Sequence, residues 1–238
     1  MKKLMIGLAI AMLASAASAA ILASDDFSYT GALTANGWTA YSGADGSITS
    51  DGNVASVGSG AEDLRFSSAF ADQLAGDTFA AFNLSVSAVG GTPTYTFGFL
   101  DGTAMESRFA LVSSGTGYAI SIFGAGTANL AQTAELSFST SYLITLAYDA
   151  TTFTHSLWVN SDGTDEATPD ASFVNGSNTG IDNFFIRQAT GSGTYTLDNM
   201  VVGESFADVA PAPVPEPATM SLLGLGALAM VLRRRMSK

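Results

Sequence analysis

The chain has 238 residues, of which 47% are hydrophobic and 13% charged, with no cysteine and a single histidine. Its formal net charge is −12, because nine lysines and arginines stand against 21 acidic residues. The absence of cysteine excludes a disulfide framework and thiolate metal sites, and one histidine without cysteine cannot supply a usual zinc ligand set. The acidic balance argues against nucleic acid as a partner, because few cations are present to displace its counterions.

The first 19 residues have the composition of a secretory signal peptide. Lys2 and Lys3 form a positive start, Leu4–Leu13 is a short apolar core, and Ala17 and Ala19 frame a small-residue cleavage site. We therefore expect signal peptidase to remove residues 1–19 during export. The apolar run is too short for a membrane-spanning helix.

Between residues 20 and 210 the charge is more one-sided. This part holds 20 acidic residues and only three basic ones, Arg65, Arg108 and Arg187, so its formal net charge is −17. It is long enough to bury a core without covalent cross-links. A strongly acidic surface favours solubility outside the cell and suits divalent cations.

Short segments rich in Thr, Val, Phe, Tyr and Ile alternate here with Gly, Asn, Asp and Ser, which is typical of β-strands joined by turns. The pattern predicts one short helix, at Ala69–Leu74. It predicts strands at Asp25–Tyr29, Trp38–Tyr41, Val54–Val57, Asp63–Ser67, Thr78–Ala88, Thr94–Leu100, Arg108–Ser113, Tyr118–Phe123, Ser141–Tyr148, Thr152–Asn160, Asn183–Gln188 and Thr194–Val202. A dozen short strands with almost no helix predict an all-β, two-sheet antiparallel sandwich.

Several stretches together resemble a known family. They are Asp25–Tyr29 followed by Trp38, the hairpin Ser141–Asn160, and the closing pair Ile181–Arg187 and Tyr195–Gly203. In this order they resemble the concanavalin A-like, laminin-G-like jellyrolls of secreted bacterial proteins.

The resemblance implies a jellyroll domain over residues 20–208, in which the first and last strands are neighbours. Asp25–Phe27 is therefore expected beside Asp198–Val202. The family also implies sugar or protein binding, often with calcium. Its glucanases carry a Glu-x-Asp-x-x-Glu strand that this chain lacks, so we predict no enzymatic activity.

Catalysis is not indicated elsewhere either. His155 falls within an alternating strand pattern, on the same face as Phe153 and Leu157, and no Gly-x-Ser-x-Gly elbow accompanies it. We therefore interpret it as a structural histidine. A glycosidase would need one defined carboxylate pair, and no spacing singles one out; a glycan-cleaving enzyme remains an alternative.

Calcium is the cofactor for which the sequence offers candidate ligands. Asn160, Asp162, Asp165 and Glu166 occur in one Asn-Ser-Asp-Gly-Thr-Asp-Glu loop, which begins like an oxygen-ligand loop but lacks the glutamate at its twelfth position. We favour a solvated acidic turn over a calcium site here.

A second candidate is Asp26 with Asp198, if the first and last strands meet. Two carboxylates at one strand crossing repel each other unless a cation or hydrogen bonds compensate them.

Three aromatic residues are candidates for stacking on sugar rings, namely Trp38, Tyr41 and Trp158. Most aromatic side chains of a sandwich belong to its core, and we favour the core for Trp158, which alternates with Leu157 in its strand.

The chain closes with a proline-rich linker, residues 209–213, and a segment of distinctive composition. Pro215-Glu216-Pro217 is a stiff tripeptide, Ala218–Leu232 is uncharged and mostly apolar, and Arg233-Arg234-Arg235 follow. About 15 helical residues span roughly 22 Å, less than the ~30 Å hydrocarbon core. We expect a transient membrane helix with its arginines on the cytoplasmic side.

This order closely resembles the PEP-CTERM sorting signal of Gram-negative bacteria, over residues 214–238. The resemblance implies an exosortase as processing partner, export to the cell envelope, surface or extracellular matrix, and association with biofilm polysaccharide. The sequence as a whole therefore predicts an exported jellyroll that associates with extracellular polysaccharide. A purely structural surface protein is the other alternative.

Overall fold

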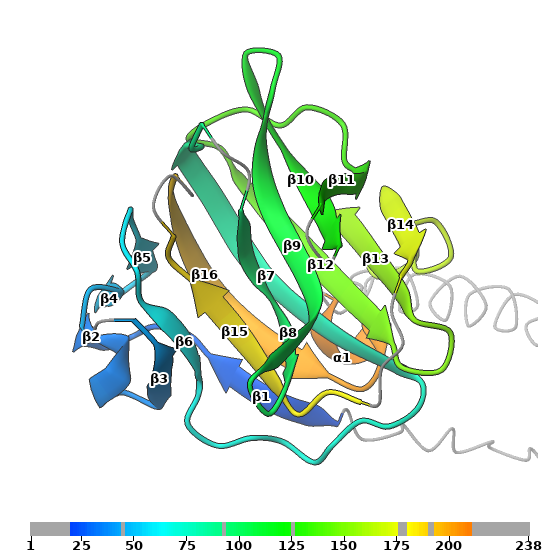
Figure 1. Ribbon diagram of the computed structural model, residues 1–238, viewed down its shortest axis with the longest axis horizontal. Coiled ribbons are helices and arrows are strands. Elements are labelled where there is room, and N and C mark those ends of the chain that lie inside the picture. The colour runs from blue at the N-terminus through cyan, green and yellow to red at the C-terminus, as the bar shows by residue number, and fades with distance from the viewer. Residues whose placement is uncertain are drawn as a thin grey trace, which may run out of the picture.

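The computed structural model describes residues 20–43, 46–91, 94–124, 127–175, 180–189 and 193–210, which form a sandwich of two antiparallel sheets (Figure 1). The nine-stranded sheet has the order β14 (Ala171–Val174), β13 (Thr154–Val159), β12 (Ser141–Asp149), β7 (Asp77–Ala88), β16 (Thr194–Gly203), β5 (Ala55–Val57), β4 (Thr49–Asp51) and β2 (Thr30–Ala32), with β1 (Ile21–Asp25) also pairing β16. The seven-stranded sheet has the order β11 (Thr127–Gln132), β10 (Gly117–Gly124), β9 (Ala104–Ser114), β8 (Tyr95–Asp101), β15 (Asn183–Arg187), β6 (Asp63–Phe66) and β3 (Trp38–Ser42). The predicted all-β jellyroll sandwich is confirmed.

Aromatic rings fill the space between the sheets. Phe82 of β7 packs edge-on against Phe97 of β8 and Phe184 of β15, with ring centroids 5.1 and 6.0 Å apart. Phe184 in turn meets Phe99 at 5.5 Å, and all four side chains are fully buried. Each such ring contributes roughly 1.5–3 kcal/mol by leaving water, which explains how a domain without disulfides can be stable.

The opening of the chain is anchored on one carboxylate. β1 pairs with β16, with Asp25 opposite Met200, so the first and last strands are neighbours as predicted. Asp25 accepts hydrogen bonds from Trp38 Nε1 at 2.6 Å, from the Tyr29 hydroxyl at 2.7 Å and from the Phe27 N–H at 2.8 Å. The strand predicted at Asp25–Tyr29 is wrong, because β1 ends at Asp25 and Phe27 has a φ of 51°, which no strand residue adopts.

Other differences have equally local causes. The helix predicted at Ala69–Leu74 is wrong, because the Phe70 and Gln73 N–H groups donate to the carbonyls of residues 182 and 181, with which this segment pairs in antiparallel fashion. β13 is shorter than the predicted Thr152–Asn160, since Phe153 and Asn160 have φ values of 59° and 56°. The strands missed are β1 apart from Asp25, β2, β4, β11 and β14, which are short or rich in small and polar residues.

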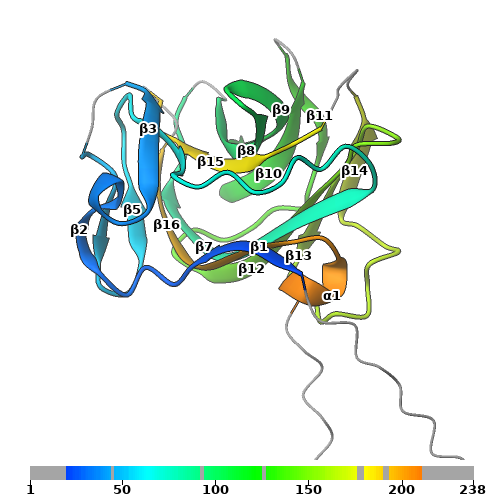
Figure 2. The same ribbon diagram turned by 90° about the horizontal axis from the view of Figure 1, so that it is seen from below.

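The end of the domain folds back onto the outside of the nine-stranded sheet. The short helix α1 (Phe206–Val209) packs there, and the Asp208 carboxylate accepts the Ser205 N–H at 2.9 Å. Val209 and Ala210 are 8% and 9% exposed, because they pack with Phe206 against this sheet. In Figure 2 the start of β1 and α1 lie side by side on this outer side, and the Glu204 N–H donates to the Ala20 carbonyl. In the described part of the chain, no helix is long and apolar enough to cross a membrane.

Candidate functional site

The outer face of the seven-stranded sheet carries a row of side chains that cross four strands. Arg65 of β6 lies opposite Phe185 of β15, Phe185 opposite Gly98 of β8, and Gly98 opposite Arg108 of β9. Residues directly opposite in antiparallel strands point to the same face. The Cα atoms of Arg65 and Arg108 are therefore about 14 Å apart, three strand spacings of ~4.8 Å, with β15 and β8 between them.

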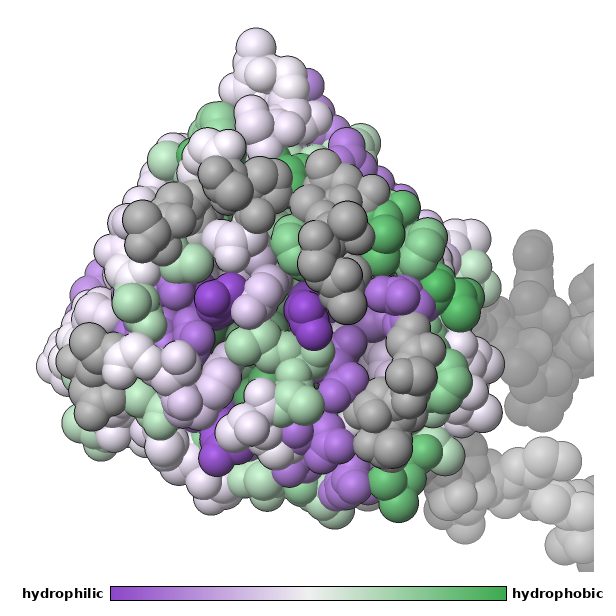
Figure 3. All heavy atoms as spheres, viewed as in Figure 1, coloured by the Kyte–Doolittle hydropathy of each residue, from purple (hydrophilic) through white to green (hydrophobic). Residues whose placement is uncertain are grey.

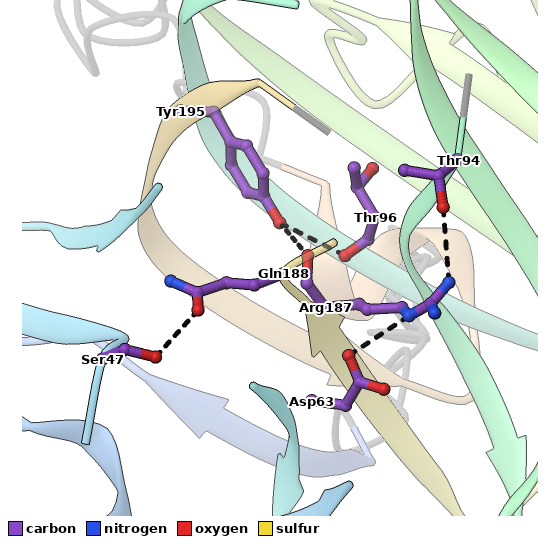
Figure 4. Close-up of polar contacts among 7 residues, drawn as sticks. All are labelled: Ser47, Asp63, Thr94, Thr96, Arg187, Gln188 and Tyr195. Carbon is purple, nitrogen blue, oxygen red and sulfur yellow. Dashed lines mark hydrogen bonds and ion pairs between the residues drawn. The ribbon is translucent and has the colours of Figure 1, made fainter. Parts of the chain in front are cut away.

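Arg187 lies between these two arginines, one pleat further along β15. Its Nε forms an ion pair with Asp63 at 3.2 Å, and its Nη1 donates to the Thr94 hydroxyl at 3.3 Å (Figure 4). Its carbonyl accepts the Tyr195 hydroxyl, which comes from the other sheet and also donates to the Thr96 carbonyl. The guanidinium is thus held from two sides and its backbone is anchored from below.

Tyr95 stands at the centre of the face. The guanidinium carbons of Arg187 and Arg108 lie 4.0 and 5.4 Å from its ring centroid, within the range of cation–π attraction. The ring also contacts Phe185 edge-on at 6.2 Å. Gly98 makes this possible, since a Cβ there would overlap the Ser107 carbonyl and approach the Phe185 ring to 3.1 Å.

All three basic residues of the segment 20–210 therefore lie on one face, which we call the arginine face and define by Arg65, Arg108, Arg187, Tyr95 and Phe185. Figure 3, viewed from the same side as Figure 1, shows strongly hydrophilic side chains gathered in the middle of this face beside apolar ones. The other arginines are held by carbonyls: Arg65 donates through Nη1 to Gly102, and Arg108 through Nε to Met105 at 3.0 Å. Among the described residues these bonds leave N–H donors of both guanidinium groups for a ligand.

Burial shifts the pKa values of two groups beside Arg187. The pKa of Asp63 is raised, because the cost of burying the charge outweighs the opposing effect of Arg187. Burial likewise raises the pKa of Tyr41 well above its ordinary range, and its hydroxyl has no partner among the described residues. Both shifts disfavour the negatively charged forms, and Arg187 opposes them in each case.

The predicted sugar-stacking aromatics do not form this site together. Trp38 is 1% exposed and stacks on Phe66 at 4.2 Å, and Trp158 is 4% exposed beneath Phe206 of α1. Both rings are buried in this arrangement, as the sequence analysis preferred for Trp158, and glycan stacking by Trp38 and Trp158 remains a prediction that their burial does not support. Only Tyr41 lies at the arginine face, half-buried beside Asp63 and Arg187.

The acidic loop after β13 is held by its own turns. The Asp162 carboxylate accepts both the N–H and the hydroxyl of Thr164, and these bonds lower its pKa. Asp165 uses its carbonyl to accept Trp158 Nε1 at 3.0 Å, while its carboxylate oxygen Oδ1 is buried without a partner in the described residues. Asn160 accepts the Leu143 N–H, which caps the strand pair.

The second calcium candidate lies where β1 meets β16. Asp26 accepts the Ser28 N–H at 3.1 Å, and Asp198 accepts the side-chain amide of Asn199 at 2.7 Å. A shallow pocket of about 390 Å³ lies there, lined by Ser24, Asp25, Asp26, Asn199, Met200 and Val201. In the described part of the chain, no three histidine or carboxylate side chains converge as a metal site would require. Calcium binding by Asn160, Asp162, Asp165, Glu166, Asp26 and Asp198 remains a prediction.

The single histidine has a partner that the sequence did not reveal. His155 Nδ1 and the Ser107 hydroxyl are 2.8 Å apart, and Nε2 lies 2.6 Å from the Asn175 carbonyl. Since a carbonyl only accepts, Nε2 carries the proton and Ser107 donates to Nδ1. The two side chains are 2% and 0% exposed, and burial lowers the pKa of His155. This serine–histidine pair lies in the core, which supports the structural interpretation of His155.

Tyr95, Arg108 and Arg187 were not predicted as site residues. Their gathering depends on pairings between β6, β15, β8 and β9, segments that are up to 124 residues apart in the chain. One signal was present in the sequence: a segment with a net charge of −17 retains three arginines. The sorting residues Pro215, Glu216, Pro217, Arg233, Arg234 and Arg235, and the cleavage residues Ala17 and Ala19, lie outside the described residues.

Comparison with known proteins gives one family match and a set of fold matches. The PEP-CTERM protein-sorting motif matches residues 213–235. This motif implies export, exosortase processing and sorting to the surface or envelope of a Gram-negative cell. None of the curated proteins matches the chain at a significant level.

Among solved structures, a sialidase superposes with a TM-score of 0.52 at 14% identity, over 78% of this chain and 18% of the sialidase. The chain thus spans less than a fifth of that protein's length. The carbohydrate recognition domain of Emp46p matches with a TM-score of 0.49 at 7% identity, over 78% of this chain and 96% of that domain. The globular domain of T. cruzi calreticulin matches with a TM-score of 0.47 at 11% identity, over 78% and 88% of the two chains. At these identities the similarity concerns the fold alone.

Proposed function

We propose that this protein is exported, processed by an exosortase, and associates through its sandwich with extracellular polysaccharide at the cell surface or in the biofilm matrix. The observation that carries the proposal is the pairing of the sorting motif at residues 213–235 with a jellyroll domain that ends directly before it. Proteins with this signal are expected at the site where polysaccharide is secreted. A polysaccharide-binding domain would therefore be delivered to the place where its ligand occurs.

The arrangement of the sandwich supports a role in display. Both ends of the described domain, Ala20 and Ala210, lie beside the nine-stranded sheet, whereas the arginine face lies on the opposite sheet (Figure 2). A tail held in the membrane would leave the arginine face pointing outward. This orientation suits contact with polymer outside the cell.

We propose further that the domain binds without cleaving. A glycosidase needs two carboxyl groups facing one bond, and a Ser–His hydrolase needs substrate access to its serine. The Ser107–His155 pair is enclosed in the core, which supports a binding role over catalysis.

The test is a glycan array probed with purified exported protein, with and without chelator. Retention on polysaccharides without release of shorter products supports the proposal. Release of reducing ends from a retained polysaccharide would replace it with the glycan-cleaving alternative. Absence of retention on every glycan would leave a structural surface protein.

A further inference from the structure

The geometry points to an anion-binding site on the arginine face, in which Arg108 and Arg187, arranged around Tyr95, bind the carboxylate groups of an acidic polysaccharide. This inference rests on the proposed function for the polymer class and adds the charge of its sugars. Of the residues predicted from the sequence as sugar-binding candidates, Tyr41 is the one that lies at this face.

The first argument is the distribution of charge. The segment 20–210 has only three basic residues among 20 acidic ones, and all three are on the outer face of one sheet. Cations spread for solubility would be scattered, because each would lower its energy near different acidic side chains. Two of them instead share one aromatic ring, at 4.0 and 5.4 Å, where their mutual repulsion has to be offset.

The second argument is preorganisation. Arg187 is fixed by Asp63 and Thr94, and only 23% of its side chain is exposed. Arg108 is fixed through its Nε by a carbonyl of its own strand. A guanidinium group that is already held loses little side-chain entropy when it binds a ligand. Each planar fork can then present its remaining N–H donors to a planar carboxylate.

The third argument concerns what compensates Arg187. Asp63 lies directly opposite Arg187 on the neighbouring strand β6, and its side chain is only 6% exposed. The carboxylate therefore holds the guanidinium from the side, while 23% of the Arg187 side chain stays exposed. The hydrogen bonds of Arg65 and Arg108 go to backbone carbonyls, which carry no charge to neutralise them, and Glu106 is a carboxylate that interacts electrostatically with Arg108.

The domain's overall charge of −17 repels an acidic polymer at long range. Binding therefore requires that salt screens this repulsion while the short-range contacts at the arginine face remain. At 0.15 M salt the Debye length is about 8 Å, shorter than the ~10 Å that separates the two stacked sheets. Direct contacts at the arginine face are then felt more strongly than acidic residues on the opposite sheet. Binding is therefore best measured at 0.15 M salt.

The experiment measures the binding of purified exported protein to immobilised polysaccharides at 0.15 M salt. The probes are polygalacturonate, its fully methyl-esterified form, dextran sulfate and neutral dextran. We expect polygalacturonate to bind at least about tenfold more tightly than its methyl ester, since the ester removes the charged hydrogen-bond acceptor. Arg108→Gln should weaken binding roughly five- to tenfold, and Arg108→Lys should fall between, because it keeps the charge but loses the fork.

The matched control is Ser172→Asp, which lowers the net charge by one unit on the exposed edge strand β14 of the other sheet. It should leave the affinity for polygalacturonate within twofold of that of the unchanged protein, because salt screens a charge on the opposite sheet from the arginine face. A melting curve for each variant checks that it is folded. If Arg108→Gln is unfolded, the comparison is made with Arg108→Lys.

The outcomes separate the two proposals. Equal binding of the methyl ester, neutral dextran and polygalacturonate would overturn the anionic site and leave polysaccharide binding standing. Loss of affinity in Ser172→Asp as large as in Arg108→Gln would also overturn the site. Dextran sulfate that binds as tightly as polygalacturonate supports the site and assigns recognition to charge rather than to the planar carboxylate. Failure to bind any of the four polymers overturns the site together with the proposed function.

Discussion

The two outer faces of the sandwich use aromatic side chains in opposite ways. On the nine-stranded sheet, Phe79 and Trp158 are covered by Phe206 of α1, with ring centroids 5.7 and 5.1 Å from it. We call this the helix face and define it by Phe79, Trp158, Phe206 and Val209. On the seven-stranded sheet, no helix of the described residues packs on Tyr95, which is flanked by two guanidinium groups instead.

What covers an outer-face aromatic ring therefore distinguishes a structural ring from one that is available to a ligand. An aromatic ring on an outer face needs a cover, because exposed apolar area is unfavourable. The chain supplies that cover on the helix face with its own C-terminal segment, next to the point where the sorting signal begins. On the arginine face the cover is charged, and charged groups at a surface can still bind a partner.

The largest expected effect is that of Trp158→Ala on the helix face. Removing the ring leaves a cavity beneath α1, and such changes cost about 3–5 kcal/mol of unfolding free energy. For a domain of this size each kcal/mol lowers the melting temperature by about 2–4 °C. Calorimetry measures the shift.

Tyr95→Ala is the matched variant on the arginine face. It should cost less, about 1–2 kcal/mol, because Tyr95 is half-buried and no helix packs on it. Equal losses for the two variants would mean that the two faces do not differ in the way described. Polysaccharide binding by Trp158→Ala, measured below its melting temperature, should be unchanged.

An effect smaller than that of Trp158→Ala is expected for Arg187→Met, and it should depend on pH. The variant leaves the Asp63 carboxylate buried without its ion-pair partner, which we expect to cost about 2–3 kcal/mol at pH 7. Burial already raises the pKa of Asp63, and loss of Arg187 raises it further. As the pH falls, Asp63 becomes protonated in the folded variant, so the difference between variant and unchanged protein should shrink towards pH 4. A difference that stays constant from pH 7 to pH 4 would exclude Asp63 as its source.

His155 lies between the two faces and provides the next smaller effect. Burial holds its folded-state pKa below the ordinary value of 6.5, so the unfolded chain binds the proton more readily. Its contribution to stability is therefore complete above about pH 6.5 and is lost as the pH falls from there towards the folded-state pKa. The loss is at most about 1.4 kcal/mol per pH unit. Urea unfolding of the unchanged protein and of His155→Gln between pH 7.5 and 5.5 measures it, and parallel pH profiles would contradict it.

The sequence predicted the layers of this molecule better than its outer faces. Alternation placed His155 and Leu157 on one face of their strand and Trp158 on the other, and in β13 Leu157 packs in the main core while Trp158 packs under α1. The cover over Trp158 could not be predicted, because α1 is a four-residue helix that forms only by packing on the sheet. The arginine face could not be predicted either. Its members come from strands whose order depends on non-local pairing, and single-sequence patterns do not contain that order.

The smallest expected effect is that of calcium. A site with a dissociation constant of 1 mM would, at 5 mM calcium, add about 1 kcal/mol to the unfolding free energy, a rise of about 2–4 °C in melting temperature. We expect a shift below about 1 °C, because Asp162 and Asp26 already accept hydrogen bonds from their own turns. Melting curves in 5 mM calcium and in chelator measure it, with Asp162→Asn and Asp198→Asn as variants. A shift of several degrees that disappears in one variant would assign a calcium site to that residue's loop and make calcium, rather than arginine, the first candidate for holding an acidic sugar.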